Sequence, residues 1–159
     1  MRMTLALLTG ISLAVGASAG ENERPTGKNC DLAAPPASAG EELNHGVTMR
    51  IYPRARDIGP GYTGCQLVWL PNGNQWFTMS AVAIERGEPI RIWAPEEAKP
   101  EFLACRYEQG RVVAGDPSKC PMARFLLMRS MGPGCVETVR KAVAAGGLGA
   151  PRPPECEYE

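Results

Sequence analysis

The residues with the clearest chemistry in this chain are six cysteines, because sulfur can act as a nucleophile, ligate a metal or form a disulfide. They are Cys30, Cys65, Cys105, Cys120, Cys135 and Cys156. Each lies at least 15 positions from the next, so none belongs to the short C-x-x-C pairs of zinc sites and thiol oxidoreductases. An even number of widely spaced cysteines is typical of a disulfide framework in an oxidising compartment.

The segment FLACRYEQGRVVAGDPSKCP, residues 102–121, places Cys105 and Cys120 on either side of a predicted β-hairpin. A reactive thiolate usually needs a histidine base or a cationic neighbour, and the chain has one histidine. We therefore predict that this pair forms a disulfide, since closing such a loop stabilises a fold by about 3 kcal/mol. Six cysteines allow many connectivities, of which we favour pairing of sequence neighbours: Cys30 with Cys65, Cys105 with Cys120, and Cys135 with Cys156.

The single histidine, His45, follows Glu41 and Glu42 at a spacing that permits metal ligation. A lone histidine beside a glycine in a loop is more often solvated, so we predict no metal site here. One histidine also leaves little basis for Ser/His/Asp or Cys/His catalysis. The sequence contains no phosphate-binding glycine loop and no acidic calcium loop, and we expect no cofactor.

The sequence neither establishes nor excludes catalysis by a pair of carboxylates. Two facing carboxylates could act as a glycosidase pair, but nothing in the sequence places any two at the required separation. Glutamates near turns are also ordinary on protein surfaces, so we predict no catalytic residue. The glutamates near predicted strand ends are Glu85, Glu88, Glu96, Glu97, Glu101 and Glu108.

The segment MRIYPRAR, residues 49–56, combines Arg50, Arg54 and Arg56 with Tyr52. Arginine and tyrosine are enriched at the centres of protein interfaces, so this cluster is a candidate binding surface. The alternative is a solvated strand face that continues into a loop. Trp93 is a second candidate, because it alternates with apolar neighbours and precedes a proline-bounded loop, whereas Trp69 and Trp76 are predicted to lie in the core.

The first 19 residues resemble a leader for export. Arg2 precedes a short apolar run, and Ala17-Ser18-Ala19 fits a small-x-small cleavage site. The run is shorter than the roughly 20 residues that cross a bilayer, so we expect no membrane insertion after cleavage. With 17 basic and 17 acidic residues, the chain also lacks the basic excess of a nucleic-acid binder. We predict a periplasmic or secreted protein.

The elements that must position these residues are mostly strands. Residues 20–44 are rich in Pro, Ala, Gly and charge, and are predicted to form a flexible arm fixed at Cys30. Apolar alternation and turn signals then predict a single disulfide-linked domain over residues 45–159. The expected strands are 47–52, 65–70, 75–85, 90–93, 102–108 and 111–114.

The C-terminal part is predicted to contain helix. Cys135 to Ala145 places Cys135, Val136, Val139 and Val143 on one face. Residues 122–131 could be a helix or a last strand. The predicted fold class is therefore α+β: an antiparallel β-meander of five to six strands, with one or two C-terminal helices on one face and three disulfides. On strand 75–85, simple alternation puts Trp76 with Val82 and Ile84.

Three segments carry a resemblance to a known family. Residues 85–89, 93–95 and 102–108 read ERGEP, WAP and FLACRYE, which resembles the G-x-P … L-x-P … CrY pattern of the STY0301 family of small exported bacterial proteins. Cys120 would match the final cysteine of that family. The helix after Cys135 and the additional cysteines depart from the pattern. The resemblance implies export and a β-rich fold, and it implies no activity.

Together these observations predict a small exported protein that is not an enzyme and that binds another envelope protein, as an inhibitor or immunity factor would. A structural accessory subunit of a secretion or conjugation apparatus is an alternative. A cell-wall-active or thiol-redox enzyme is another.

Overall fold

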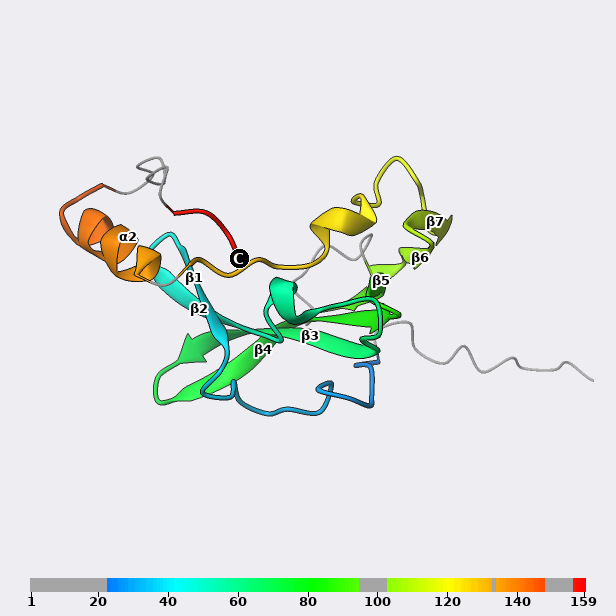
Figure 1. The fold of residues 1–159 in the computed structure, drawn as a ribbon, viewed down its shortest axis with the longest axis horizontal. Coiled ribbons are helices and arrows are strands. Elements are labelled where there is room, and N and C mark those ends of the chain that lie inside the picture. The colour runs from blue at the N-terminus through cyan, green and yellow to red at the C-terminus, as the bar shows by residue number, and fades with distance from the viewer. Residues whose placement is uncertain (1–22, 95–102, 133, 148–155) are drawn as a thin grey trace, which may run out of the picture.

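The described residues of this computed structural model are 23–94, 103–132, 134–147 and 156–159. Among them, seven strands form one antiparallel sheet in which each strand pairs with the next along the chain (Figure 1). The fold is thus an α+β meander, as predicted. The elements are β1 (Gly40–Asn44), β2 (Val47–Tyr52), β3 (Gly64–Asn72), β4 (Gln75–Glu85), β5 (Glu88–Trp93), β6 (Arg106–Glu108), β7 (Arg111–Ala114), the 3-10 turns η1 (Ala55–Asp57) and η2 (Ala123–Phe125), and the helix α2 (Cys135–Ala144).

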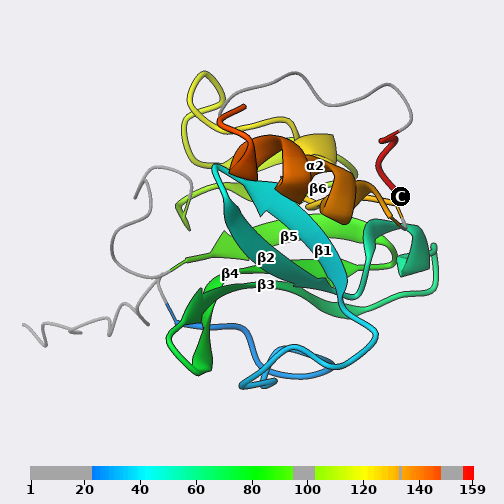
Figure 2. The same cartoon turned by 90° about the vertical axis from the view of Figure 1, so that its left-hand side faces the viewer.

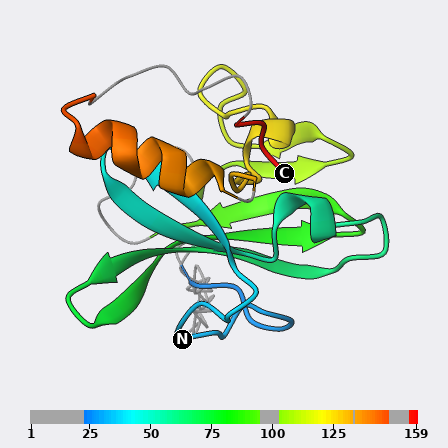
Figure 3. The same cartoon turned by 60° about the vertical axis from the view of Figure 1, so that its left-hand side comes forward.

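Both faces of the sheet are apolar at its centre, so both must be covered. On β3, Leu67 and Trp69 point to one face while Val68 points to the other, and all three are fully buried. Helix α2, η2 and the last residues cover the Val68 face, whereas residues 23–39 run along the Leu67 face (Figures 2 and 3). The sheet therefore lies between a helical layer and an extended segment.

Three disulfides attach these covering segments, and all three predicted pairs are confirmed. Cys30–Cys65 joins the N-terminal segment to β3, Cys105–Cys120 closes the loop beyond the β6–β7 hairpin, and Cys135–Cys156 joins α2 to the C-terminal residues. Chain-entropy estimates give each about 3 to 4 kcal/mol of stabilisation. Three disulfides indicate a protein that folds in an oxidising, non-cytoplasmic compartment. No helix in the described part of the chain is long and apolar enough to cross a membrane.

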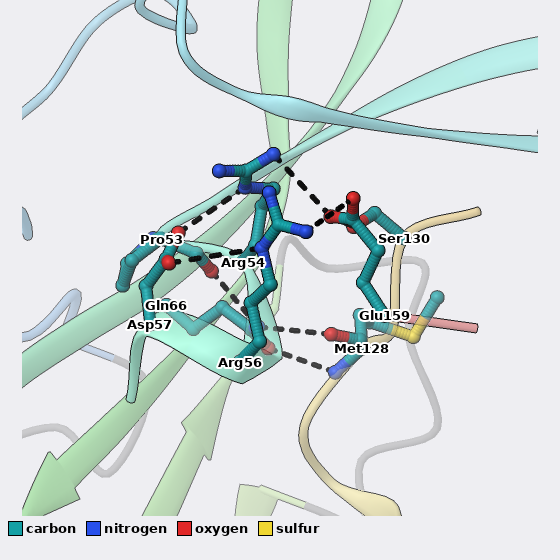
Figure 4. Close-up of polar contacts among 8 residues, drawn as sticks. All are labelled: Pro53, Arg54, Arg56, Asp57, Gln66, Met128, Ser130 and Glu159. Carbon is teal, nitrogen blue, oxygen red and sulfur yellow. Dashed lines mark hydrogen bonds and ion pairs between the residues drawn. The ribbon is translucent and has the colours of Figure 1, made fainter. Parts of the chain in front are cut away.

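The segment after η2 has little regular structure and is held by a buried side chain of β3 (Figure 4). Gln66 is fully buried. Its Nε2 donates to the carbonyls of Met128 and Pro53 at 2.9 and 3.1 Å, and its Oε1 accepts from the Met128 N–H at 2.8 Å. The side chain thus pairs with Met128 as a neighbouring strand would. The chain then continues past β1, where the Met131 N–H donates to the Glu41 carbonyl at 2.8 Å.

Three segments differ from the sequence prediction. The strand predicted over residues 102–108 begins only at Arg106, because residues 103–105 are not in a strand. The predicted arm over residues 20–44 is wrong at its end, because residues 40–44 form strand β1 and pair with β2 through a two-residue turn. Residues 122–131, predicted as a helix or a strand, form only the short turn η2 and a single bridge between Met131 and Tyr158. The Gln66 contacts take the place of a regular ladder there. The predicted leader, residues 1–19, lies outside the described residues.

A β-bulge changes the face of one tryptophan. Val68 pairs with Ser80 and Trp69 pairs with Thr78, so Met79 is an extra residue on β4. An extra residue shifts the alternation by one, which moves every earlier side chain to the opposite face. Trp76 therefore packs with Trp69 and not with Val82, contrary to the simple alternation.

We predict that Gln66→Leu lowers the free energy of unfolding by about 2 to 5 kcal/mol. The change leaves one N–H and two carbonyl groups without their partner, and each such group costs about 1 to 3 kcal/mol when buried. Urea titration followed by tryptophan fluorescence measures the effect. The matched control is Gln75→Leu, since Gln75 is exposed on β4. Equal stability of the two variants would contradict a central role for the Gln66 amide.

We also predict that Gly40→Ala destabilises the protein by about 1 to 3 kcal/mol through overpacking. A Cβ atom on Gly40 would lie 2.5 Å from Ser130 Oγ and closer still to Ser130 Cβ, and Ser130 is fully buried. Gly59→Ala is the control, because a Cβ there meets no atom within 4 Å. Thermal unfolding of both variants tests the contact. A Gly40→Ala variant as stable as Gly59→Ala would show that the C-terminal segment packs differently.

Candidate binding cleft

Two of the predicted binding arginines are engaged within the chain. Arg56 Nη1 lies 2.8 Å from Glu159 Oε1, and Arg54 Nη1 lies 3.4 Å from Glu159 Oε2. Arg54 Nε also pairs with Asp57 Oδ2 at 3.2 Å, and the Ser130 hydroxyl donates to Glu159 at 3.1 Å (Figure 4). Only 7% of the Glu159 side chain is exposed. These arginines therefore neutralise a nearly buried carboxylate.

Arg50 is also engaged. Its guanidinium forms an ion pair with Glu41 on the neighbouring strand β1. The Arg50 Cζ lies 5.9 Å from the centre of the Trp76 ring, within the range of a cation–π contact. Arg50 thus links the edge strand to the tryptophan cluster.

The two aromatic candidates are half-buried. Tyr52 and Trp93 pack against the cluster formed by Leu67 and Trp69 beneath the N-terminal segment. Arg24 from that segment lies over Trp93 at 5.9 Å from the ring centre. The structure therefore does not bring the five predicted residues together as one free surface, and their role in binding stays a prediction.

A different place in the fold forms a cleft. Within the described residues, β5 and β6 pair only at Arg91 and Arg106. Beyond that pair the two strands separate, so the turn after β4 and the turn after β6 lie on opposite sides of an opening. The opening has a volume of about 850 Å³ and is bounded by Pro25 of the N-terminal segment and by Val113 of β7. The sheet thus forks, and the cleft lies in the fork.

The charges in this cleft are sorted by sign along its length. Arg91 and Arg106 stand directly opposite each other at the closed end. Glu85 and Glu88 stand opposite each other across the β4–β5 turn at the mouth. Like charges at directly opposed positions, with Cβ atoms about 4.5 to 5.5 Å apart, destabilise a sheet. The facing carboxylates of Glu85 and Glu88 therefore have a cost in folding.

Further charges lie at the mouth of the cleft. Glu108, at the end of β6, adds negative charge there but faces Arg111 of β7, and Arg86 on the β4–β5 turn offsets part of the remaining negative charge. Among the described residues the side chains of Glu85, Glu88, Arg106 and Glu108 form no ion pair, in contrast to the arginines around Glu159. The cleft therefore presents a basic inner end and a mainly acidic mouth to solvent.

A small residue forms the floor of the cleft, and an apolar residue forms part of its rim. Ala83 lies beside Arg91 on β4, and its short side chain leaves room above the sheet. Val113 is 54% exposed on β7, the last strand of the sheet. Such a surface can hold a charged, extended group between apolar walls. The sequence predicted that Glu85, Glu88 and Glu108 lie near strand ends. It could not show that Arg106 faces Arg91.

Two other places in the fold carry residues of interest, the β1–β2 turn and the segment at η2. His45 occupies the turn between β1 and β2 with a φ of 47°, and no group of three or more His, Cys, Asp or Glu in the described ranges could hold a metal. On the opposite face of the sheet, η2 exposes Met122 and Phe125, at 54% and 63%. Exposed apolar side chains of this size often mark contact surfaces.

Burial raises the pKa of two tyrosines, Tyr62 and Tyr107. The pKa of Tyr62 is raised above its ordinary value by burial, although hydrogen bonds with Asn29 and the Cys65 carbonyl act in the other direction. The pKa of Tyr107 is raised by burial, and its hydroxyl donates to the Pro121 carbonyl at 2.7 Å. Both phenols are therefore held in the neutral form.

An exposed carboxyl shows the opposite shift. The pKa of Asp116 is lowered, mainly because the Ser118 hydroxyl and N–H donate hydrogen bonds to its carboxylate. This turn follows β7 and supports the loop that Cys120 closes.

Comparison with known proteins gave no match to a family model, to a curated protein or to a solved structure. The resemblance to the STY0301 family therefore stays a prediction.

We predict that the contribution of Tyr62 and Tyr107 to stability is constant below about pH 10 and that stability falls as the pH rises above it. A phenol with a raised folded-state pKa keeps its proton in the folded state and loses it in the unfolded state above pH 10.0, so unfolding becomes easier. Urea titrations at several pH values test this. A Tyr62→Phe/Tyr107→Phe double variant should show a flatter dependence, and an unchanged slope would contradict the assignment.

Proposed function

We propose that this chain is an exported binding protein without enzymatic activity, and that it contacts another envelope protein through the cleft between β5 and β6. The observation that carries the proposal is a solvent-open cleft in which Glu85 and Glu88 face each other and Arg106 forms no ion pair among the described residues. Natural proteins commonly accept a stability cost where a surface must bind. A partner with a cationic group would relieve the repulsion between Glu85 and Glu88, and a carboxylate on the partner could pair with Arg106.

The disulfides support a location outside the cytoplasm, and we propose the periplasm or the extracellular medium. A rigid, cross-linked sheet suits an inhibitor or immunity-type protein, because a preorganised surface loses little conformational entropy on binding. One observation supports the accessory-subunit alternative. Met122 and Phe125 are exposed on the face of the sheet opposite the cleft and could contact a second protein. All three disulfides are formed and the described residues contain no free cysteine, which argues against thiol chemistry.

The test is capture of a partner from the cell envelope by the oxidised protein, followed by affinity measurement with the purified partner. We expect Arg106→Glu to weaken binding by about tenfold or more, because an interfacial charge would become repulsive. Arg129→Glu is the matched control, since Arg129 is exposed outside the cleft. Phe125→Ser tests the second surface.

The outcomes separate the hypotheses. Loss of binding in Arg106→Glu alone supports the cleft. Loss in Phe125→Ser alone supports a binding protein that uses η2 and moves the contact away from the cleft. Capture of peptidoglycan alone, or of no protein, would contradict the proposed function.

A further inference from the structure

We propose that Asn72, in the turn between β3 and β4, is a site of spontaneous deamidation that forms aspartate and isoaspartate. The reactants are the chain itself and water. The sequence contains a single Asn–Gly step, Asn72–Gly73, and the structure places it in an exposed hairpin turn. The β5–β6 cleft lies at the other end of β4, so this site is separate from the proposed binding surface.

The reaction joins the side chain of Asn72 to the backbone that follows it. The Gly73 backbone nitrogen loses its proton and attacks Asn72 Cγ. The bond from Cγ to Nδ2 then breaks, and the departing nitrogen takes up a proton and leaves as ammonia. Water opens the resulting five-membered succinimide ring at either of its two carbonyls. Opening at one gives aspartate, and opening at the other gives isoaspartate, in which the backbone passes through the former side chain.

Both reacting groups are open to water. Asn72, Gly73 and their neighbours in the turn are exposed, and Figure 3 shows the turn projecting from one end of the sheet. Within the part of the chain that the structure describes, the Asn72 side chain and the Gly73 N–H form no hydrogen bond. A Cβ atom on Gly73 would meet no atom within 4 Å. Hydroxide and water can therefore reach both groups.

The hairpin itself requires the residue that makes the step reactive. Asn72 pairs with Gln75, so Gly73 and Asn74 form a two-residue turn. Gly73 has a φ of 59°, which glycine adopts at little cost and which is unfavourable for residues with a side chain. Glycine also leaves the backbone nitrogen unhindered for attack. The same residue thus serves the turn and exposes Asn72 to deamidation.

The other asparagines among the described residues lack this combination. Asn29 Nδ2 donates to the Tyr62 hydroxyl at 2.8 Å, and the N–H that follows it, on Cys30, is also hydrogen-bonded. Asn44 and Asn74 are exposed, but each precedes a residue whose side chain hinders attack by its backbone nitrogen. We therefore expect modification at Asn72 first.

Isoaspartate at this position changes the end of the hairpin. It adds one methylene to the backbone and one negative charge to the turn. The pairs nearest the turn are Asn72 with Gln75 and Pro71 with Trp76, and a longer backbone cannot keep both in register. Trp76 packs against the Trp69 cluster, so we expect the tryptophan fluorescence to change as isoaspartate forms.

The experiment incubates the oxidised full chain for several days at physiological temperature, at neutral and at mildly alkaline pH. Trypsin then releases residues 57–86 after reduction, and fragmentation of this peptide separates Asn72 from Asn74. A mass gain of about 1 Da marks exchange of the amide for a carboxyl group. We expect progressive loss of unmodified Asn72, faster at the higher pH because the attacking nitrogen must lose its proton. Enzymatic methylation of isoaspartate identifies the second product.

Two variants serve as controls. Asn72→Gln keeps the amide but would need a six-membered ring, so its peptide should stay unmodified. Gly73→Ala adds a methyl group beside the attacking nitrogen and should retain most of its Asn72 over the same period.

Three results would overturn the proposal. The first is a folded protein that keeps Asn72 while the reduced, unfolded chain loses it, since the hairpin would then protect the step. The second is an Asn72 that survives in both states. The third is loss of Asn44 or Asn74 as fast as loss of Asn72, because the Asn–Gly turn would then have no special reactivity.

Discussion

The hydrogen bonds between the Gln66 amide and the backbone of Met128 hold together two parts of the chain that regular structure does not join. Met128 belongs to the segment that brings Ser130 against Gly40 and delivers Met131 to the edge of β1. Through that segment the amide also fixes the groups around Glu159. A buried amide can do this because it offers a donor and an acceptor in the spacing of a peptide group. An apolar residue at position 66 would fill the same space without specifying a register.

The two arginine-rich regions show how surroundings decide the use of a charge. Arg54 and Arg56 surround one nearly buried carboxylate, where their removal would leave that charge uncompensated. Arg106 lies at a fork in the sheet, is exposed and forms no ion pair among the described residues. The first arrangement serves folding. The second leaves a cationic group open to solvent, and that makes the fork a candidate for recognition.

Local sequence signals predicted much of this fold. The hairpin between Cys105 and Cys120 predicted one disulfide, and a preference for sequence neighbours supplied the other two. Apolar patterns and turn signals predicted β2 to β5, and the 3.6-residue period predicted α2 to within one residue. Strand β1 was missed because it lies in a segment rich in Pro, Ala and charge, and forms by pairing with β2. The face of Trp76 depends on a bulge at Met79, and the cleft depends on where β5 and β6 separate. Bulges and forks arise from contacts between strands, which a single sequence does not record.

The order of the disulfides has a consequence for biogenesis. Each cysteine is bonded to the next one along the chain, so no bond spans another. When a chain emerges from its N-terminus, Cys30 meets Cys65 before any other cysteine is present, and the same holds in turn for the later pairs. Simple oxidation in order of appearance therefore yields the native set. This route needs only a general oxidant and no enzyme that reshuffles incorrect disulfides.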